Sequence, residues 1–339
     1  MPDQTKPADV ASSVSADEIA RAAALLDAGE LVAFPTETVY GLGGDAESPE
    51  AVARIYAAKG RPANHPVIVH LAPQGDPNYW VEQLPSDAQR LIDAFWPGPL
   101  TLILKRAAHI PAAVSGGQDS VGLRCPSHPV AQALLTAFSA LRNGHGGVAA
   151  PSANRFGHVS PTTAQHVRDE FGDAVYVLEG DGVEVGIEST IVDLSRLDQD
   201  VGPVLLRPGA ITPEMMAEVL GVAPSTPDAT APRASGTLKA HYAPRTPLLL
   251  ADAQQLVDQL AALPADARVA WVGRAPVADT RCTWVKAPAT PDAYARDLYR
   301  LLRKLDKDGY DRLVFEPLPG GEDWAGVRDR LQRAAAAFE

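Results

Sequence analysis

A stretch rich in Pro, Ala, Ser and Thr, from Gly221 to Pro247, divides this chain of 339 residues into two parts. The stretch has little apolar periodicity, so it predicts a linker rather than a helix or a strand. On both sides of it, short apolar runs alternate with amphipathic segments, which is typical of α/β domains. A chain of this length exceeds what one hydrophobic core usually serves, and we therefore predict two domains.

The part before the linker predicts a mixed, twisted sheet with helices. Ser15 and Glu18 form a capping-box pattern at the start of a helix that Gly29 ends. Ser48 followed by Pro49 predicts a second helix start, and 86–95 reads as a third helix. Buried strands are expected at 31–34, 66–71, 100–105, 121–124, 147–150, 174–178, 190–194 and 204–206.

The part after the linker predicts a small Rossmann-like α/β unit of about 90 residues. Its expected strands are LLLA, RVAWVG, TWVKA and LVFEP, with helices between them and at the end. It has no GxGxxG turn, so we assign it no dinucleotide.

These patterns give a disordered lead-in at 1–15, a first domain at 16–212, a linker at 213–247 and a second domain at 248–339. No apolar run is long enough to span a bilayer, and the N-terminus lacks the pattern of a secretion signal. Two cysteines, Cys125 and Cys282, fit a reducing compartment. We therefore predict a cytoplasmic protein that does not engage a membrane.

The formal net charge of −12 and the pI near 5.1 argue against a dedicated nucleic-acid binder. Such proteins usually carry an excess of Lys and Arg, because phosphate neutralisation dominates their affinity. A local cluster of cations is still able to hold a small anion.

Two pairs of residues are candidates for such a site. Lys59 and Arg61 lie on a predicted loop, and Ser152 and Asn154 follow a predicted strand. Lys and Arg suit phosphates or carboxylates, whereas Ser and Asn orient polar substrates. Each pair also has an ordinary interpretation, as solvated surface cations or as turn-forming residues, and taken alone that interpretation is favoured.

The segment from Phe34 to Gly44 holds Thr36, Thr38 and several glycines. It predicts either close backbone approach to an anion or a tight turn packed on a sheet, and the two are evenly balanced. Arg124 ends a strand, where it needs an internal carboxylate or a ligand as partner. A lone strand-end histidine such as His70 is more often structural. The histidines and acids show no metal-ligand spacing, so no metal site is assigned.

The order of the segments decides between these alternatives. FPTETVYGLGG, KGRPANHPVIVH, WPGPLTLIL, VGLRCP, PSANRFGHVSPTTA, GIESTIVD, LLRPG and HYAP follow one another along the chain. Together they closely resemble the L-threonylcarbamoyladenylate synthases of the YrdC-like superfamily. More narrowly, the chain is similar to the long form, which adds a small Rossmann-like domain through a linker.

The resemblance implies roles for particular residues. The family's catalytic tetrad falls on Lys59, Arg61, Ser152 and Asn154. Threonine-side contacts fall on Thr36 or Thr38, His70, Arg124, Ser152 and Ser189. ATP-side contacts fall on Lys59, Arg61, His65, Ser120, Asn154, Ser160 or Thr162, Arg207 and Tyr242. The HYAP segment of the linker is expected to fold over the nucleotide as a lid.

The resemblance also implies the reaction. L-threonine, bicarbonate or CO2, and ATP with Mg²⁺ would be condensed to threonylcarbamoyladenylate and pyrophosphate by a nucleotidyltransferase. A partner complex would then pass the threonylcarbamoyl group to the adenosine next to the anticodon of tRNAs that read ANN codons. With this net charge, we expect weak or no direct binding of tRNA by the chain itself.

Three other functions remain alternatives. A binding protein would use a basic face for RNA, which the acidic total charge disfavours. A carbamoyltransferase of the hydrogenase-maturation type carries Cys-x-x-Cys zinc fingers, which two isolated cysteines exclude. An inactive relative with the same fold is disfavoured because all positions of the tetrad are filled.

Overall fold

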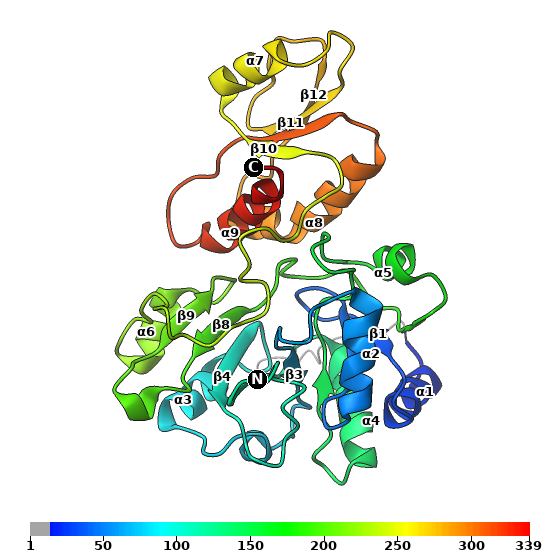
Figure 1. The fold of residues 1–339 in the computed structure, drawn as a ribbon, viewed down its shortest axis with the longest axis vertical. Coiled ribbons are helices and arrows are strands. Elements are labelled where there is room, and N and C mark those ends of the chain that lie inside the picture. Colours follow the sequence, from blue (N-terminus) through cyan, green and yellow to red (C-terminus); the bar gives the residue numbers. More distant parts are fainter. Residues whose placement is uncertain (1–13) are drawn as a thin grey trace, which may run out of the picture.

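The computed structural model describes residues 14–339, so the predicted lead-in at 1–15 lies outside the described residues except for its last two positions. The described chain forms a nine-stranded sheet and a separate four-stranded sheet. Figure 1 shows them in two parts that follow one another along the long axis, with the C-terminal part at the top. The predicted combination of a mixed α/β sheet and a smaller α/β unit is confirmed.

The large sheet is mixed and has the order β7-β1-β2-β6-β3-β5-β4-β8-β9. Neighbours β1 and β2 are antiparallel, whereas β3 and β5 are parallel. The strands are β1 Val32–Phe34, β2 Gly41–Asp45, β3 Ile68–His70, β4 Leu100–Lys105, β5 Ser120–Arg124, β6 Val148–Ala149, β7 Tyr176–Val177, β8 Thr190–Asp193 and β9 Val204–Arg207.

Helices surround this sheet, and the local sequence explains where they begin and end. Before α2, Ser48 accepts a hydrogen bond from the backbone of Ala51, and Gly60 ends the helix in the left-handed region at φ 64°. The expected capping box of Ser15 and Glu18 is present at α1. The helices are α1 Ala16–Asp27, α2 Pro49–Lys59, α3 Ser86–Phe95, α4 Pro129–Leu141, α5 Ala164–Phe171 and α6 Pro213–Leu220.

Two segments differ from the sequence-based expectation. Residues 41–45, for which a tight turn or an anion-binding backbone segment was expected, form the interior strand β2. A side chain at Gly43 would lie 2.8 Å from Val148 and 2.9 Å from Phe34, so glycine lets the neighbouring strands pack there. Residues 213–220, expected in the linker, form α6, whose Met216 and Leu220 join the N-terminal core.

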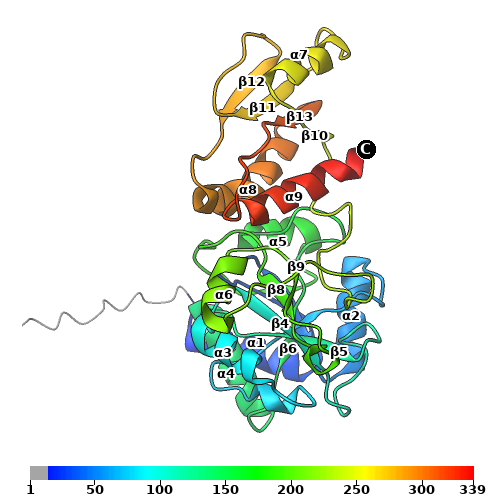
Figure 2. The same ribbon diagram turned by 90° about the vertical axis from the view of Figure 1, so that its left-hand side faces the viewer.

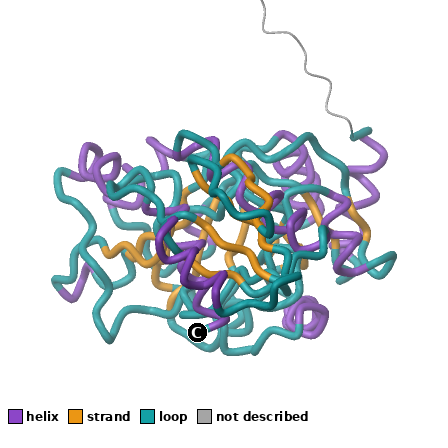
Figure 3. Tube along the Cα trace, turned by 90° about the horizontal axis from the view of Figure 1, so that it is seen from above, coloured by secondary structure: helices purple, strands orange, loops and turns teal. Residues whose placement is uncertain are grey.

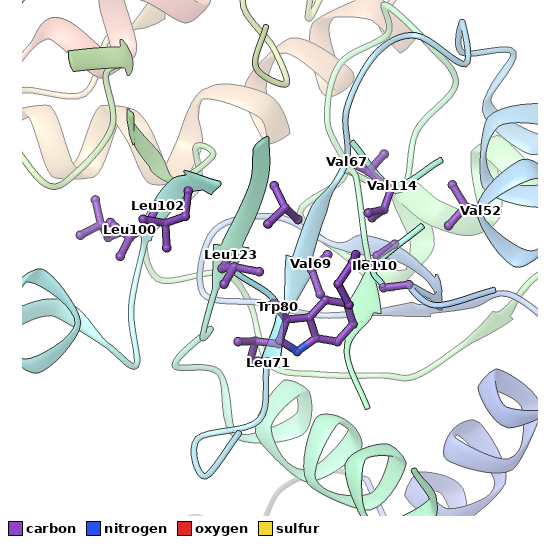
Figure 4. Packing of buried hydrophobic residues seen from close by; sticks show 14 of the residues in the cluster. Val52, Val67, Val69, Leu71, Trp80, Leu100, Leu102, Ile110, Val114 and Leu123 are labelled. Carbon is purple, nitrogen blue, oxygen red and sulfur yellow. The ribbon is translucent and has the colours of Figure 1, made fainter. Parts of the chain in front are cut away.

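The N-terminal core fixes the strand ends that carry polar groups. Trp80 is only 1% exposed and packs among aliphatic side chains that include Val69 and Leu123 (Figure 4). Strands β3 and β5 run through this core in parallel, with His70 opposite Arg124 at their carboxyl ends. Their common direction brings both polar side chains to one edge of the sheet.

The C-terminal sheet is parallel, with the order β10-β13-β11-β12. Its elements are β10 Leu248–Leu250, α7 Ala253–Ala261, β11 Val269–Gly273, β12 Cys282–Lys286, α8 Pro291–Lys307, β13 Arg312–Phe315 and α9 Ala325–Ala335. Helix α7 packs on one face through Leu256 and Leu260, and α8 and α9 pack on the other. In Figures 1 and 2, α8 and α9 lie on the side that meets the N-terminal part.

Ion pairs join the two parts. Arg303 of α8 pairs with Glu170 of α5 at 2.9 Å, and Arg330 of α9 pairs with Glu188 at 2.8 Å. The segment 221–247 runs between the parts, and Ala243 forms a bridge with His158. The C-terminal part lies above the N-terminal one in Figures 1 and 2, and in the view from above (Figure 3) the C-terminus lies near the lower edge of the molecule. No described helix combines the length and the apolarity needed to cross a membrane.

Candidate active site

A cavity lies where β3, β5 and the loop after β6 meet the segment that precedes β10. Its wall contains residues from early and late in the sequence of the N-terminal part, and residues of the segment 235–242. The predicted site residues found in the wall are Thr36, Thr38, Lys59, Arg61, His70, Arg124, Ser152, Asn154, Ser189, Arg207 and Tyr242. The fold thus brings together side chains that lie more than two hundred residues apart in the sequence.

The two cations of the first candidate pair are buried. Lys59 ends α2, and its Nζ donates to the carbonyl oxygens of Ser152, at 2.6 Å, and of Asn154. Burial lowers the pKa of Lys59 well below its usual value, and Arg61 lowers it further. Burial also lowers the pKa of Arg61 to about 10, and its Nε has no hydrogen-bond partner among the described residues. A bound anion would offset the cost of burying both positive charges.

Arg124 has the internal carboxylate that its strand-end position required. Its Nη2 donates to Glu37 at 2.7 Å and to the hydroxyl of Thr38 at 2.9 Å, and its Nε donates to Gly98. Both members of the ion pair have side chains no more than 5% exposed. The Nη1 group makes no hydrogen bond with the described residues, so a ligand carboxylate is able to use it.

His70 is held as a neutral ring. It is 3% exposed, and burial together with Arg124 lowers its pKa to about 3. Its Nδ1 has no hydrogen-bond partner in the described part of the chain. A buried neutral imidazole with a free nitrogen suits a hydroxyl-bearing ligand better than it suits proton transfer near neutral pH.

Asn154, Ser189 and Arg207 supply further polar groups. The Nδ2 of Asn154 donates to the carbonyls of Arg155 and His158, which leaves its Oδ1 without a partner among the described groups. Arg207 donates to the carbonyl of Ser189 at 2.9 and 3.0 Å and to its hydroxyl at 3.1 Å. Arg207 is fully buried and has a lowered pKa because of that burial.

The segment 235–242 closes the cavity from the linker side. Tyr242 is 1% exposed, adopts a left-handed backbone at φ 61°, and its hydroxyl has no partner among the described residues. His241 packs edge-on against Tyr242 and Phe156, and burial lowers its pKa to about 3. Gly236 is essential to this geometry, because a Cβ there would lie 2.0 Å from the Tyr242 hydroxyl.

Some predicted contacts are not part of the cavity wall. Ser160 gives its hydroxyl to Glu188 at 2.6 Å, and Thr162 is buried against His166. His65 lies beside Phe156 with a ring-centroid distance of 5.4 Å, outside the wall. Ser120 begins β5, pairs with Lys105 of β4 and lines a different pocket. Ser160 and Thr162 therefore bind partners within the protein, whereas His65 and Ser120 lie away from the cavity wall.

The cavity also contains residues that the sequence analysis did not select. Glu188, Ser235, His241 and Phe156 line it, and Glu37 binds Arg124 from behind the wall. Glu188 precedes Ser189 in GIESTIVD, and His241 precedes Tyr242 in HYAP. Their position next to predicted site residues was the only sign in the sequence that Glu188 and His241 belong to the site. The ion-pair partner that lets Glu188 be buried, Arg330, lies more than a hundred residues later in the sequence.

The described residues contain no group of three or more His, Cys, Asp or Glu side chains arranged to hold a metal ion. Glu188 is the carboxylate in the cavity wall, and Arg330, Tyr299 and Ser160 already engage both of its oxygens. Mg²⁺ prefers oxygen ligands and keeps several waters. The protein side of this cavity therefore does not fit a resident Mg²⁺ ion.

Comparisons with known proteins identify the family of both parts. Residues 24–209 match the family described as "Telomere recombination", and residues 211–336 match the family described as "Threonylcarbamoyl-AMP synthase, C-terminal domain". The chain is 33% identical to the threonylcarbamoyl-AMP synthase of Pyrococcus abyssi over 326 residues, which is 93% of each chain. It is 36% identical to that of Bacillus subtilis over 344 residues, or 96% of each.

The fold agrees with these sequence matches. A crystal structure of P. abyssi Sua5 complexed with L-threonine superposes with a TM-score of 0.84 at 32% identity, over 96% of each chain. The similarity therefore extends over nearly the full length of both chains. The chain belongs to the threonylcarbamoyl-AMP synthase family.

Proposed function

We propose that the chain condenses L-threonine, bicarbonate or CO2, and ATP into threonylcarbamoyl-AMP and pyrophosphate. The observation that carries this proposal is one cavity whose wall contains two chemically different groups of side chains. Arg124, Thr38 and neutral His70 suit a hydroxy amino acid, whereas Lys59, Arg61 and Arg207 suit a polyphosphate. Membership in the synthase family supports the same reaction.

The threonine end is built around Arg124. We infer that its Nη1 binds the substrate carboxylate while Glu37 and Thr38 hold the other edge of the guanidinium. The substrate hydroxyl would meet the free Nδ1 of His70 or the hydroxyl of Thr36. Ser152 and Ser189 would face the amine and the carbamate that forms on it.

The chemistry proceeds in two balanced steps. The threonine amine combines with CO2 to give a carbamate and a proton, or with bicarbonate to give the same carbamate and a water molecule. A carbamate oxygen then attacks the α-phosphorus of ATP, and the bond from that phosphorus to the pyrophosphate oxygen breaks. Negative charge accumulates on the α-phosphoryl oxygens and on the leaving pyrophosphate. Lys59 and Arg61 place fixed positive charge there, which is the electrostatic contribution that such sites make.

The nucleotide end would use Lys59, Arg61, Asn154, Arg207 and Tyr242. The pKa values of the buried cations are lowered by burial, so the free protein holds them at a cost. A triphosphate removes that cost, and binding energy from the phosphates therefore favours the charged form of Lys59. Asn154 Oδ1 and the Tyr242 hydroxyl are unused by the described residues and are available to the nucleoside.

The segment 235–242 would act as a lid. The enclosed free volume of the cavity is about 40 Å³, whereas one water occupies roughly 30 Å³ in the liquid. This space is far smaller than an ATP molecule, and we infer that the segment opens for substrates and closes during the reaction. Closure would protect the carbamate, which is short-lived in water.

Mg²⁺ would enter as part of the ATP substrate, coordinated by phosphates and water, because the cavity offers no free carboxylate set. The product would pass to a separate cytoplasmic transferase complex that acts on tRNA. A formal net charge of −12 supports leaving tRNA binding largely to that complex.

Pyrophosphate release tests the proposal. We expect release from ATP to require both L-threonine and bicarbonate, with L-serine and L-valine supporting much less of it. Release that continues at the same rate when threonine or bicarbonate is omitted would show a simple ATP hydrolase instead.

A further inference from the structure

The segment 186–189, which lines the cavity at Glu188 and Ser189, is held between two helices of the C-terminal part. Gly186 has φ 83°, and a Cβ there would lie 2.3 Å from the Cα of Arg296 on α8. On α9, a Cβ at Gly326 would lie 2.8 Å from the side chain of Ile187. Glycine at both positions lets the helices approach the segment more closely than any other residue would permit.

Behind this contact, Tyr299 of α8 and Arg330 of α9 bind one carboxylate oxygen of Glu188, and Ser160 of the N-terminal part binds the other. Oε2 accepts hydrogen bonds from Arg330 Nε and from the Tyr299 hydroxyl, each at 2.8 Å, and Oε1 accepts one from Ser160 at 2.6 Å. Arg330 is 0% exposed and also donates to the carbonyls of Glu188 and Pro208. A buried carboxylate needs this kind of complete pairing to remain charged.

Arg330 itself does not line the cavity, yet it balances a charge that does. Glu188 faces the cavity beside the cations assigned to the phosphates, and an uncompensated carboxylate there would repel ATP. The guanidinium of Arg330 also lies over the ring of Tyr242, 5.4 Å from its centroid. One buried side chain of α9 thus touches both Glu188 and the closing segment.

We propose that Arg330 is a positioning residue of the synthase, which fixes Glu188 and cancels its charge beside the ATP phosphates. The inference rests on the proposed function. It gives the C-terminal part a direct role in nucleotide affinity, in addition to its connection to the closing segment. The affinity for threonine, which binds through Arg124, should not depend on Arg330.

Steady-state kinetics of Arg330→Met, Glu188→Gln and the double variant test this role. We expect Arg330→Met to raise KM for ATP roughly tenfold or more, because removing one partner leaves a buried charge unpaired. KM for threonine should stay within about twofold. The double variant removes both charges and should recover most of the ATP affinity, so the two substitutions should be clearly non-additive.

The pH dependence of KM for ATP distinguishes a role of Arg330 in balancing the charge of Glu188 from a purely structural role. Burial raises the pKa of Glu188, but Arg330 and Arg207 outweigh burial and hold it at about 2. Without Arg330 that pKa rises, so Glu188 is neutral at low pH and charged at high pH. The other titratable groups around it are Lys59, Arg207, Tyr242, His241 and Tyr299. Asp329 on α9 also pairs with Arg330, at 2.7 Å. KM for ATP in Arg330→Met should therefore increase with pH, relative to wild type and to the double variant.

Arg303→Met is the matched control. It removes another buried ion pair between the two parts, with Glu170 at 2.9 Å and both side chains 10% exposed, but neither residue lines the cavity. We expect its KM for ATP to remain near the wild-type value. Urea unfolding of every variant would confirm that kinetics are measured on folded protein. If Arg330→Met does not fold, Tyr299→Phe removes a hydrogen bond from the same oxygen and should give a smaller ATP-specific rise.

An unchanged KM for ATP in Arg330→Met, an equal rise in Arg303→Met, or a double variant no better than Arg330→Met would overturn the proposal. Calorimetric titration of ATP into the same variants tests the role of Arg330 independently of the proposed function. If wild type binds ATP but makes no threonine-dependent pyrophosphate, the proposed function fails. The pattern of ATP affinities among the variants would still support or refute the role of Arg330.

Discussion

The Nζ of Lys59 donates a hydrogen bond to the carbonyl oxygen of Ser152 at 2.6 Å. This contact ties the end of α2 to the loop that follows β6, although the two residues lie 93 positions apart. The two weak sequence signals, a K-x-R loop and a Ser-x-Asn turn, are therefore one structure. Lys59 both shapes the cavity wall and supplies charge to it.

Replacing Lys59 with Met should lower turnover by roughly 10²-fold or more, because a preorganised charge at the reacting phosphate is lost. Arg61→Ala should have a loss of the same order. Arg54→Met is a suitable control, since Arg54 lies on the same helix but is 51% exposed and pairs with Glu30. Threonine-dependent pyrophosphate release measures all of these variants. A Lys59→Met enzyme as active as the Arg54→Met control would remove Lys59 from the mechanism.

Arg124→Lys should weaken threonine more than ATP. Lys keeps the positive charge but cannot hold Glu37, Thr38 and a carboxylate at once. Losing a hydrogen bond to a charged group costs roughly 1.5–3 kcal/mol, so KM for threonine should rise about 10- to 100-fold. KM for ATP serves as the internal reference. Parallel increases in both constants would argue that Arg124 is structural instead.

The buried histidines should make the fold less stable in mild acid. The pKa values of His70 and His241 are each lowered to about 3, chiefly by burial. Unfolded histidine titrates near 6.5, so the unfolded chain binds protons first as pH falls, and stability is lost from about pH 6.5 downward. Each histidine should contribute a slope of about 1.4 kcal/mol per pH unit in that window. Urea unfolding between pH 7 and pH 5 measures it.

His70→Gln and His241→Gln should each flatten that dependence, because Gln does not titrate. Turnover should also show no ionisation of His70 near neutral pH, as the ring stays neutral throughout the working range. A slope of stability against pH that is identical in wild type and both variants would contradict the burial argument.

Gly236→Ala should disturb the closing segment. The new Cβ would meet the Tyr242 hydroxyl at 2.0 Å, and the residue has φ 76°, which alanine adopts poorly. We expect a weaker affinity for ATP, several-fold to tenfold, with little change for threonine. Gly182→Ala is the matched control, because its Cβ would have no neighbour within 4 Å and its backbone is not left-handed. Equal effects of the two substitutions would count against the lid.

Regular periodicity made much of the fold predictable. Capping residues placed α1 and α2, and apolar runs placed β4, β5 and β11 close to their observed bounds. Strand β2 escaped prediction because GLGGD has neither alternation nor β-branched residues. Its identity as a strand depends on Phe34 and Val148 packing over its glycines, which is a tertiary effect.

In the site, too, some residues could be predicted from the local sequence, whereas others depend on tertiary contacts. Lys59, Arg124 and Asn154 were predictable from their residue types and from the resemblance of their segments. Glu188 was not, because a lone acid before a strand has no visible partner in sequence. Its counter-ion Arg330 lies 142 residues away on a helix of the other part. Long-range charge pairing of this kind is a property of the folded chain alone.

Isotope incorporation tests the central claim most directly. The purified protein would be incubated with ATP, L-threonine and ¹³C-bicarbonate, and the products separated and weighed by mass spectrometry. We expect an adenylate that carries the threonyl group and the labelled carbon, formed in equal amount with pyrophosphate and lost in Lys59→Met. Pyrophosphate or AMP formed without a labelled threonine adduct would contradict the account.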